Sequence, residues 1–153
     1  MAATDESARF RIDVEDAVGI WDRACGPASA QFDLVPGQAI ERYDATHQQP
    51  LQRIPLPDWT AFENGHIDWD HRDFARLLGL DDVPEGVALI LVTDEGLRDK
   101  CAFRFPRSEL ASFTRWYEAN YGMDFFQSAD YLIFDENLEH IRILHHEGVV
   151  FRK

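Results

Sequence analysis

The sequence is poor in the residues that most readily identify a chemical function. Its 153 residues include only two Cys and, among 15 basic side chains, only two Lys. Cys25 and Cys101 are too few and too far apart for a disulfide framework or a zinc site, so we expect each to be a small buried hydrophobic residue. We accordingly predict neither a cysteine-based metal site nor a cofactor.

Long apolar runs are also missing. The longest, at positions 87–92, has six residues, whereas a helix that spans a membrane needs about 20. The first seven residues have neither the basic region nor the apolar region of a secretory signal. We therefore expect a cytoplasmic protein that does not bind membranes.

Motifs for catalysis and for nucleic-acid binding are absent as well. No serine lies in a nucleophile elbow, and none of the nine Gly belongs to a phosphate-binding loop. No segment carries the excess of Lys and Arg that phosphate contacts require. We predict a protein that does not bind nucleic acid and is not an enzyme, with an active site assembled from distant residues as the alternative.

Acidic residues are what the sequence does contain. It has 28 Asp and Glu against 15 Lys and Arg, a net charge of −13, together with 45% hydrophobic and 12% aromatic residues. Disordered acidic tails lack this apolar content, so we expect one folded domain over residues 1–153, preceded by a flexible tail at 1–8. An acidic surface attracts basic partners and repels nucleic acid.

The first half of the chain predicts a helix, a strand and a loop. Apolar residues repeat at helical spacing over 14–25, where Asp13 can cap the helix and Gly26 ends it. Residues 31–35 alternate like a strand, and 38–43 are ambiguous, with a second strand as one interpretation. Residues 44–58 include three prolines and predict an irregular loop.

The second half predicts an antiparallel sheet. A short helix capped by Asp70 precedes a hairpin at 87–105, a helix over 108–121 capped by Ser108 follows it, and a three-stranded meander occupies 131–152. The predicted fold is therefore α+β, with the hairpin and the meander in an antiparallel sheet and two to three helices packed on one of its faces.

Two polar clusters offer ligands for a metal ion. The first holds His66, Asp68, Asp70 and His71, and the second lies at 140–146, with His145 and His146 at its end. The first fits no established ligand spacing, and Asp70 serves equally well as a helix cap. Adjacent strand residues point to opposite faces, so His145 and His146 are expected to diverge. We predict no metal site, and a small metal-dependent enzyme using either cluster is the alternative.

An acidic and aromatic surface is the predicted binding site. Recognition surfaces often hold aromatic anchors ringed by polar groups, and carboxylates form charge-assisted hydrogen bonds with Arg and Lys. Aromatic and acidic residues of this kind are concentrated between positions 59 and 85. The predicted partner-binding residues are Trp59, Asp68, Trp69, Asp70, Asp73, Asp81, Asp82 and Glu85.

The chain resembles bacterial toxin-immunity proteins as a class. The resemblance rests on its acidic α+β character and on its last quarter, which holds Tyr131-Leu132-Ile133-Phe134-Asp135-Glu136-Asn137 and His145-His146-Glu147. It implies a stoichiometric inhibitor that occludes the active site of a toxin encoded by an adjacent gene. The sequence thus predicts an acidic protein that neutralises a basic partner, a nuclease-type toxin in particular. A nucleic-acid mimic or an accessory protein of a mobile element is a further alternative.

Overall fold

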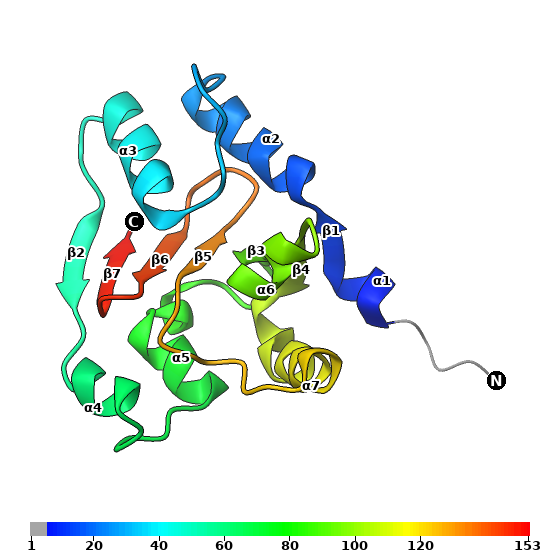
Figure 1. Cartoon of the computed structure of the whole chain (residues 1–153). Coiled ribbons are helices and arrows are strands. Elements are labelled where there is room, and N and C mark those ends of the chain that lie inside the picture. Colours follow the sequence, from blue (N-terminus) through cyan, green and yellow to red (C-terminus); the bar gives the residue numbers. More distant parts are fainter. Residues whose placement is uncertain (1–5) are drawn as a thin grey trace.

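Seven antiparallel strands form a central sheet in residues 6–153, the part of the chain that the computed structural model describes (Figure 1). Their order across the sheet is β1-β4-β3-β5-β6-β7-β2, and every neighbouring pair is antiparallel. The strands are β1 (Arg11–Asp13), β2 (Gln52–Pro55), β3 (Ala88–Val92), β4 (Cys101–Pro106), β5 (Tyr131–Phe134), β6 (Ile141–His145) and β7 (Val149–Arg152).

The predicted hairpin and meander are both confirmed. β3 and β4 pair with Leu89 opposite Phe105, and they are joined by a short helix, α6 (Asp94–Arg98), where we expected a turn. β5, β6 and β7 follow one another in the sheet as a meander. The predicted α+β class with an antiparallel sheet is therefore correct.

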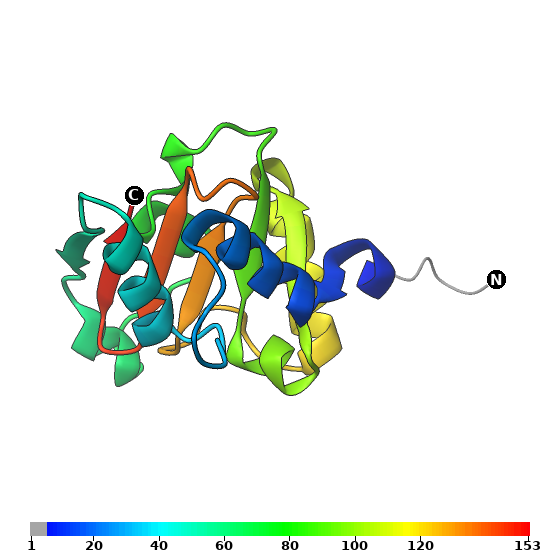
Figure 2. The ribbon, with the colours of Figure 1, turned by 90° about the horizontal axis from the view of Figure 1, so that it is seen from above.

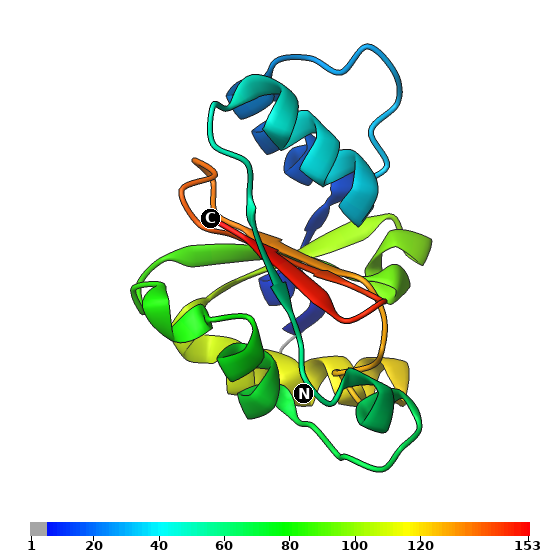
Figure 3. The same cartoon turned by 90° about the vertical axis from the view of Figure 1, so that its left-hand side faces the viewer.

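Helices cover both faces of the sheet, where one face was expected. Figure 3 shows the sheet nearly edge-on, with helices above and below it. Leu89 and Leu91 of β3 belong to one buried cluster, while Ile90 and Val92 belong to the other. The unbroken apolar run in β3 is explained by this arrangement, because a strand buried on both faces has no polar side.

Two long helices form the first layer. They are α2 (Val14–Cys25) and α3 (Pro36–Thr46). Trp21 of α2 and Tyr43 of α3 are buried against the sheet, and Figure 2 shows both helices lying across this face. The bounds of α2 are those predicted.

The second layer lies on the opposite face. It consists of α4 (Trp59–Glu63), α5 (His71–Leu77), the 3₁₀ turn η1 (Leu80–Asp82), the 3₁₀ turn η2 (Arg107–Glu109) and α7 (Leu110–Tyr121). Phe74, Phe113 and Tyr117 are fully buried here. Asp70 caps α5 as predicted, but Ser108 does not cap α7: it lies inside η2, and no side chain caps the first turn of α7.

The region 31–46 differs from its prediction. Residues 31–35 form no strand, since Leu34 has a positive φ of 56° that breaks an extended ladder. Pro36-Gly37, interpreted as a turn, instead begins α3, and 38–43 lie within that helix. Proline fits the first turn of a helix because its missing N–H would have no partner there.

The range 44–58 is not one irregular loop. α3 continues to Thr46, and Gln52–Pro55 form β2, which pairs with β7 at an edge of the sheet. Pro55 fits the end of β2 because an edge strand tolerates a missing N–H, while Pro50 and Pro57 lie just outside the strand.

The predicted tail at 1–8 lies partly outside the described residues, which begin at position 6. Helix α1 (Glu6–Phe10) starts there. It ends at Phe10, which is buried and packs edge-on against Phe113, with ring centroids 5.4 Å apart. Among residues 6–153, no helix is both long enough and apolar enough to cross a lipid bilayer.

Candidate functional site

The two tryptophans of the predicted binding surface are packing residues. Trp59 is only 5% exposed, and its indole N–H donates a 3.0 Å hydrogen bond to the carbonyl oxygen of His146. Trp69 is partly buried against Phe62 and Phe126, with ring centroids 4.7 and 5.9 Å away. Trp59 therefore has almost no surface to offer a partner, which corrects our interpretation of it as an exposed anchor.

The carboxylates beside these tryptophans are largely engaged within the chain. Asp70 and Asp73 form the capping box of α5, each accepting a main-chain N–H of the other. They also form ion pairs with Arg72 at 2.7 Å and Arg76 at 3.0 Å. Asp68 is exposed.

The remaining predicted acids are Asp81 and Asp82 of η1 and the nearby Glu85, and they pair with two arginines. Asp82 pairs with Arg152 at 2.8 Å, while Asp81 and Glu85 share Arg107 at 3.8 and 3.5 Å. Hydrogen bonding to Arg152 lowers the pKa of Asp82. Much of the negative charge expected at this surface is thus neutralised by neighbouring guanidinium groups.

A different polar cluster assembles at one end of the sheet. Val92 lies opposite Leu132, and Tyr131 lies opposite Leu144. Two residues beyond Val92, this register places Asp94 across from Asp130, and one residue beyond the Tyr131–Leu144 pair it places Asp130 across from His145. In Figure 2, α6, the start of β5 and the turn between β6 and β7 lie at the same end of the sheet. Three segments far apart in the sequence therefore bring their polar residues together.

The side chains of His145 and His146 were expected to diverge, but they lie together. Their rings stack with centroids 4.1 Å apart, because His146 has already left the strand and entered the turn. Nδ1 of His146 is 2.9 Å from Oδ1 of Asp130, which also accepts the His146 main-chain N–H at 2.8 Å. Nδ1 of His145 accepts the main-chain N–H of Glu147 at 3.1 Å. Asp130, His145 and His146 each present a potential metal-ligating atom, and these atoms lie within 4.8 Å of one another.

The electrostatics of this end of the sheet are dominated by carboxylates. Partial burial, followed by the charges of Asp130 and Glu95, raises the pKa of Asp94 above its ordinary value. The hydrogen bond to Asp130 raises the pKa of His146. Within residues 6–153, neither Asp94 nor Glu147 forms an ion pair, and Asp130 pairs only with His146. This end of the sheet, which we call the carboxylate edge (Asp94, Asp130 and Glu147), therefore carries negative charge that no Arg or Lys within residues 6–153 pairs with.

A buried hydrogen-bond network supports the carboxylate edge from the other face. The Thr93 hydroxyl caps α6 by accepting the Gly96 N–H at 3.1 Å, and it lies 2.9 Å from the Tyr117 hydroxyl. Tyr117 also hydrogen-bonds to the Glu95 carboxylate. Burial, reinforced by this bond to Glu95, strongly raises the pKa of Tyr117. The network fixes the start of α6, and with it the position of Asp94.

One apolar side chain stands beside the carboxylate edge. Val35, in the loop before α3, is 38% exposed, and in the described part of the chain no other large hydrophobic residue is classed as exposed. It lines a shallow depression together with Asp94 and Asp130. An exposed apolar group next to free carboxylates is a combination typical of protein recognition.

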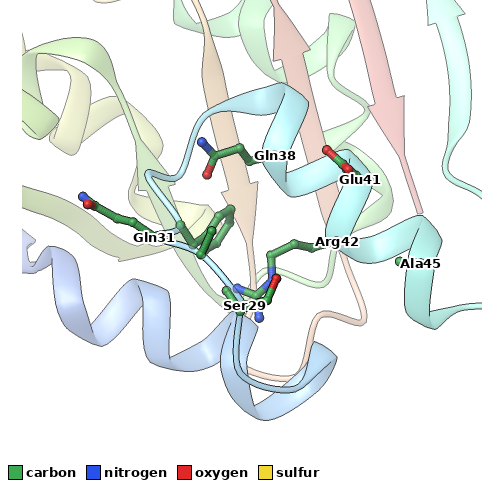
Figure 4. A pocket seen from close by; sticks show the side chains of 9 residues that line it. Ser29, Gln31, Gln38, Glu41, Arg42 and Ala45 are labelled. Atoms are coloured by element: carbon green, nitrogen blue, oxygen red, sulfur yellow. The ribbon is translucent and has the colours of Figure 1, made fainter.

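A larger pocket of about 380 Å³ lies between the 28–32 segment and α3 (Figure 4). Arg42 is the basic residue on its wall, and its guanidinium already binds Asp22 at 3.0 Å and stacks over the Phe32 ring at 4.7 Å. The charge of Arg42 is therefore balanced within the chain, which leaves the pocket without a free cation for an anionic ligand.

No family model matches the chain, and neither a curated protein nor a solved structure is detectably similar to it. The resemblance to toxin-immunity proteins therefore stays a prediction.

The two histidine clusters of the sequence have different outcomes. Among residues 6–153, only the group at Asp130, His145 and His146 brings three potential ligand atoms together, so His66, Asp68, Asp70 and His71 form no such site. His140 also lies apart, directly before β6, where its main-chain N–H donates a hydrogen bond to the Asp135 carboxylate. Asp94 and Asp130 were missed by sequence reasoning, because only the pairing of β3 with β5 brings them together. The sequence contained one indication of this proximity, because both residues lie next to the ends of predicted strands.

Proposed function

We propose that the protein is a non-catalytic acidic binding protein that acts in the cytoplasm and neutralises a basic protein partner. The partner we infer is the toxin encoded by an adjacent gene, with a nuclease-type toxin as the most specific form of the proposal. The observation that carries it is the carboxylate edge, where negative charge gathers without Arg or Lys partners in the described chain.

The carboxylate edge supports this function better than the surface around Asp81 and Glu85. At that second surface, Arg107 already lies near both carboxylates. At the carboxylate edge, partial desolvation and like charges disfavour the ionised form of Asp94, so an incoming cation relieves an existing repulsion. A basic residue of a partner would supply that cation, and Val35 would add an apolar contact beside it.

The mechanism follows from the chemistry of nuclease sites. Such sites bind phosphates with Lys and Arg, and carboxylates can occupy the same groups through charge-assisted hydrogen bonds. Complementary charge also accelerates association, toward about 10⁸–10⁹ M⁻¹s⁻¹ at low salt. The inhibitor would then exclude substrate by covering the site, without any chemical step of its own.

The test is co-purification with the product of the gene immediately upstream, followed by calorimetry and a toxicity assay. Binding in a one-to-one complex together with loss of toxicity supports the proposal. If that product neither binds nor is neutralised, the proposed function is wrong.

Two matched variants locate the surface. Asp94→Asn with Glu147→Gln removes charge from the carboxylate edge, and we expect affinity to fall about tenfold, mainly through slower association. Asp81→Asn with Glu85→Gln removes the same charge beside Arg107 and should leave affinity nearly unchanged. The opposite result would move the binding site to the surface originally predicted around residues 68–85.

A further inference from the structure

We propose that Asp130, His145 and His146 form a binding site for a divalent transition-metal ion. The donor set is two imidazoles and one carboxylate, which suits Zn²⁺ and leaves room for water or another ligand. The proposal goes beyond the proposed function, although both use Asp130. Metal binding is measured on the free protein, so its test can fail while the test of partner binding succeeds.

The separation of the donor atoms fits a shared ion. Two ligands of one tetrahedral zinc ion, each about 2.0–2.2 Å from it, lie about 3.3–3.6 Å apart. Nδ1 of His146 and Oδ1 of Asp130 are 2.9 Å apart, so an ion can replace the hydrogen between them once the two atoms separate by about half an ångström. The ligand atom of His145 lies within 4.8 Å of the other two, so the His145 ring has to rotate to bring this atom to coordination distance.

His145 must change its hydrogen bond when the ion binds. A neutral imidazole that binds a metal through one nitrogen carries a proton on the other. Nδ1 of His145 currently accepts the Glu147 N–H, so its ring has to release that bond whichever nitrogen binds the ion. The Glu147 N–H lies in an exposed turn, where water can take over as its acceptor.

Hydrogen bonds hold Asp130 and the main chain around His146 in place before any ion arrives. Asp130 accepts the His146 N–H at 2.8 Å, and Trp59 donates to the His146 carbonyl oxygen at 3.0 Å. Gly148 closes the turn beneath Trp59, with its N–H donating to the His145 carbonyl oxygen at 2.9 Å. Ligands that are fixed by such supporting bonds lose little conformational freedom on binding a metal.

The surrounding charge also favours a cation. Asp94 faces Asp130 across the strand ends, and Glu147 follows His146 in the turn. The charges of Arg98 and His146 reach Asp94, but the Arg98 guanidinium is bound to Glu95 at 3.3 Å. A bound divalent ion would balance carboxylates that have no Arg or Lys ion pair within residues 6–153.

The experiment is calorimetric titration of Zn²⁺ into the full chain, purified without an affinity tag and freed of metal with a chelator. We expect one zinc ion per chain. Affinity should fall at least tenfold in Asp130→Asn, in His145→Ala and in His146→Ala. Removing a group that only supports a metal ligand already costs about 10–100-fold in affinity. The variant His66→Ala with His71→Ala serves as the matched control and should bind like the unmodified protein.

Two further measurements make the outcome decisive. Far-UV circular dichroism with urea unfolding establishes that each variant is folded at the titration temperature. Co²⁺ titration of the unmodified protein, followed by visible absorption, reports coordination by imidazole and carboxylate without any mutation. The proposal is overturned if zinc binds only at millimolar concentration, if the three ligand variants bind as the control does, if Mg²⁺ binds more tightly than Zn²⁺, or if Co²⁺ yields only the weak absorption of the aqueous ion.

Discussion

The indole N–H of Trp59 donates a hydrogen bond to the carbonyl oxygen of His146, a residue 87 positions further along the chain. The bond fastens α4 to the turn between β6 and β7, the turn that carries both stacked histidines. The Trp59 ring packs directly against Gly148 and is therefore buried. A partner protein would contact the turn and not the ring.

Replacing Trp59 with Phe should destabilise the protein by about 1–3 kcal/mol. The change removes the hydrogen bond, leaves the His146 carbonyl oxygen without its partner and reduces the volume of a buried ring. Urea unfolding followed by circular dichroism measures the loss. Trp69→Phe is the matched control and should cost less, because the Trp69 indole donates no hydrogen bond to any described residue and its ring is only partly buried. Equal losses would contradict the structural role assigned to the Trp59 bond.

Gly148→Ala should be more damaging than Gly122→Ala. Both glycines have a positive φ, 86° and 65°, so alanine costs about 1–2 kcal/mol of backbone strain at either position. At Gly148, a Cβ would also lie 2.4 Å from Cγ of Trp59, whereas at Gly122 it would meet nothing within 4 Å. The difference between the two free energies of unfolding isolates the steric contact. Similar losses for the two variants would show that the turn and Trp59 move apart freely.

The central strands of this sheet were easier to predict from the sequence than its edge strands β1 and β2 or the helix α3. The strands at 88–92, 101–106 and 131–152 were found because apolar residues alternate or run between clear turn residues. The helix α3 was missed because Pro36-Gly37 suits both a turn and a first helical turn, and only packing against the sheet decides between them. The unbroken apolar run of β3 was the available signal for helices on both faces, because a strand buried on one face only alternates apolar and polar residues.

The candidate site was harder to foresee. Asp94, Asp130 and His145 lie on three separate segments, and their proximity depends on β5 lying between β3 and β6 in a particular register. Local pattern cannot specify that order. Composition pointed instead to Trp59 and the nearby acids, whose capping and ion-pairing roles become visible only once the arginines around them are placed.

Asp70→Ala should lower the free energy of unfolding by about 1 kcal/mol, the usual contribution of a helix N-cap. The effect depends on pH. The hydrogen bond from Arg72 is the main reason that the pKa of Asp70 falls from 3.8 to about 2. A carboxyl with a depressed pKa stabilises the fold at pH values above 3.8, and this contribution disappears as the pH falls toward 2. Because Asp70 is well exposed, solvent screening keeps the charge contribution small.

Asp70→Asn separates the charge from the cap. Asparagine also caps helices, so at pH 6 it should cost less than alanine. The difference in stability between the unmodified protein and Asp70→Asn should shrink as the pH falls from 5 to about 2, measured by urea unfolding at each pH. A difference that stays constant over this range would show that Asp70 acts through geometry alone.

Tyr117→Phe should cost about 1–2 kcal/mol, because it deletes a buried hydroxyl that links α7 to the start of α6. A hydroxyl has one proton to donate. The Glu95 carboxylate can only accept, so Tyr117 donates to Glu95 and accepts from Thr93, while the Thr93 oxygen accepts the Gly96 N–H. Removing the Tyr117 hydroxyl therefore leaves the Thr93 hydroxyl proton and a Glu95 carboxylate oxygen unpaired in a site that is mostly closed to water.

A double-mutant cycle measures whether the network acts as a unit. Thr93→Val removes the hydroxyl that caps α6, and its cost in the Tyr117→Phe background should be smaller than in the unmodified protein by about 0.5–1 kcal/mol, since part of the network is already lost. Tyr43→Phe is the control on the opposite face of the sheet: Tyr43 belongs to the other buried cluster, and its replacement should combine additively with Thr93→Val. Additive losses for both pairs would mean that packing, and not the hydrogen-bond network of Tyr117, holds Asp94 and the rest of α6 in place.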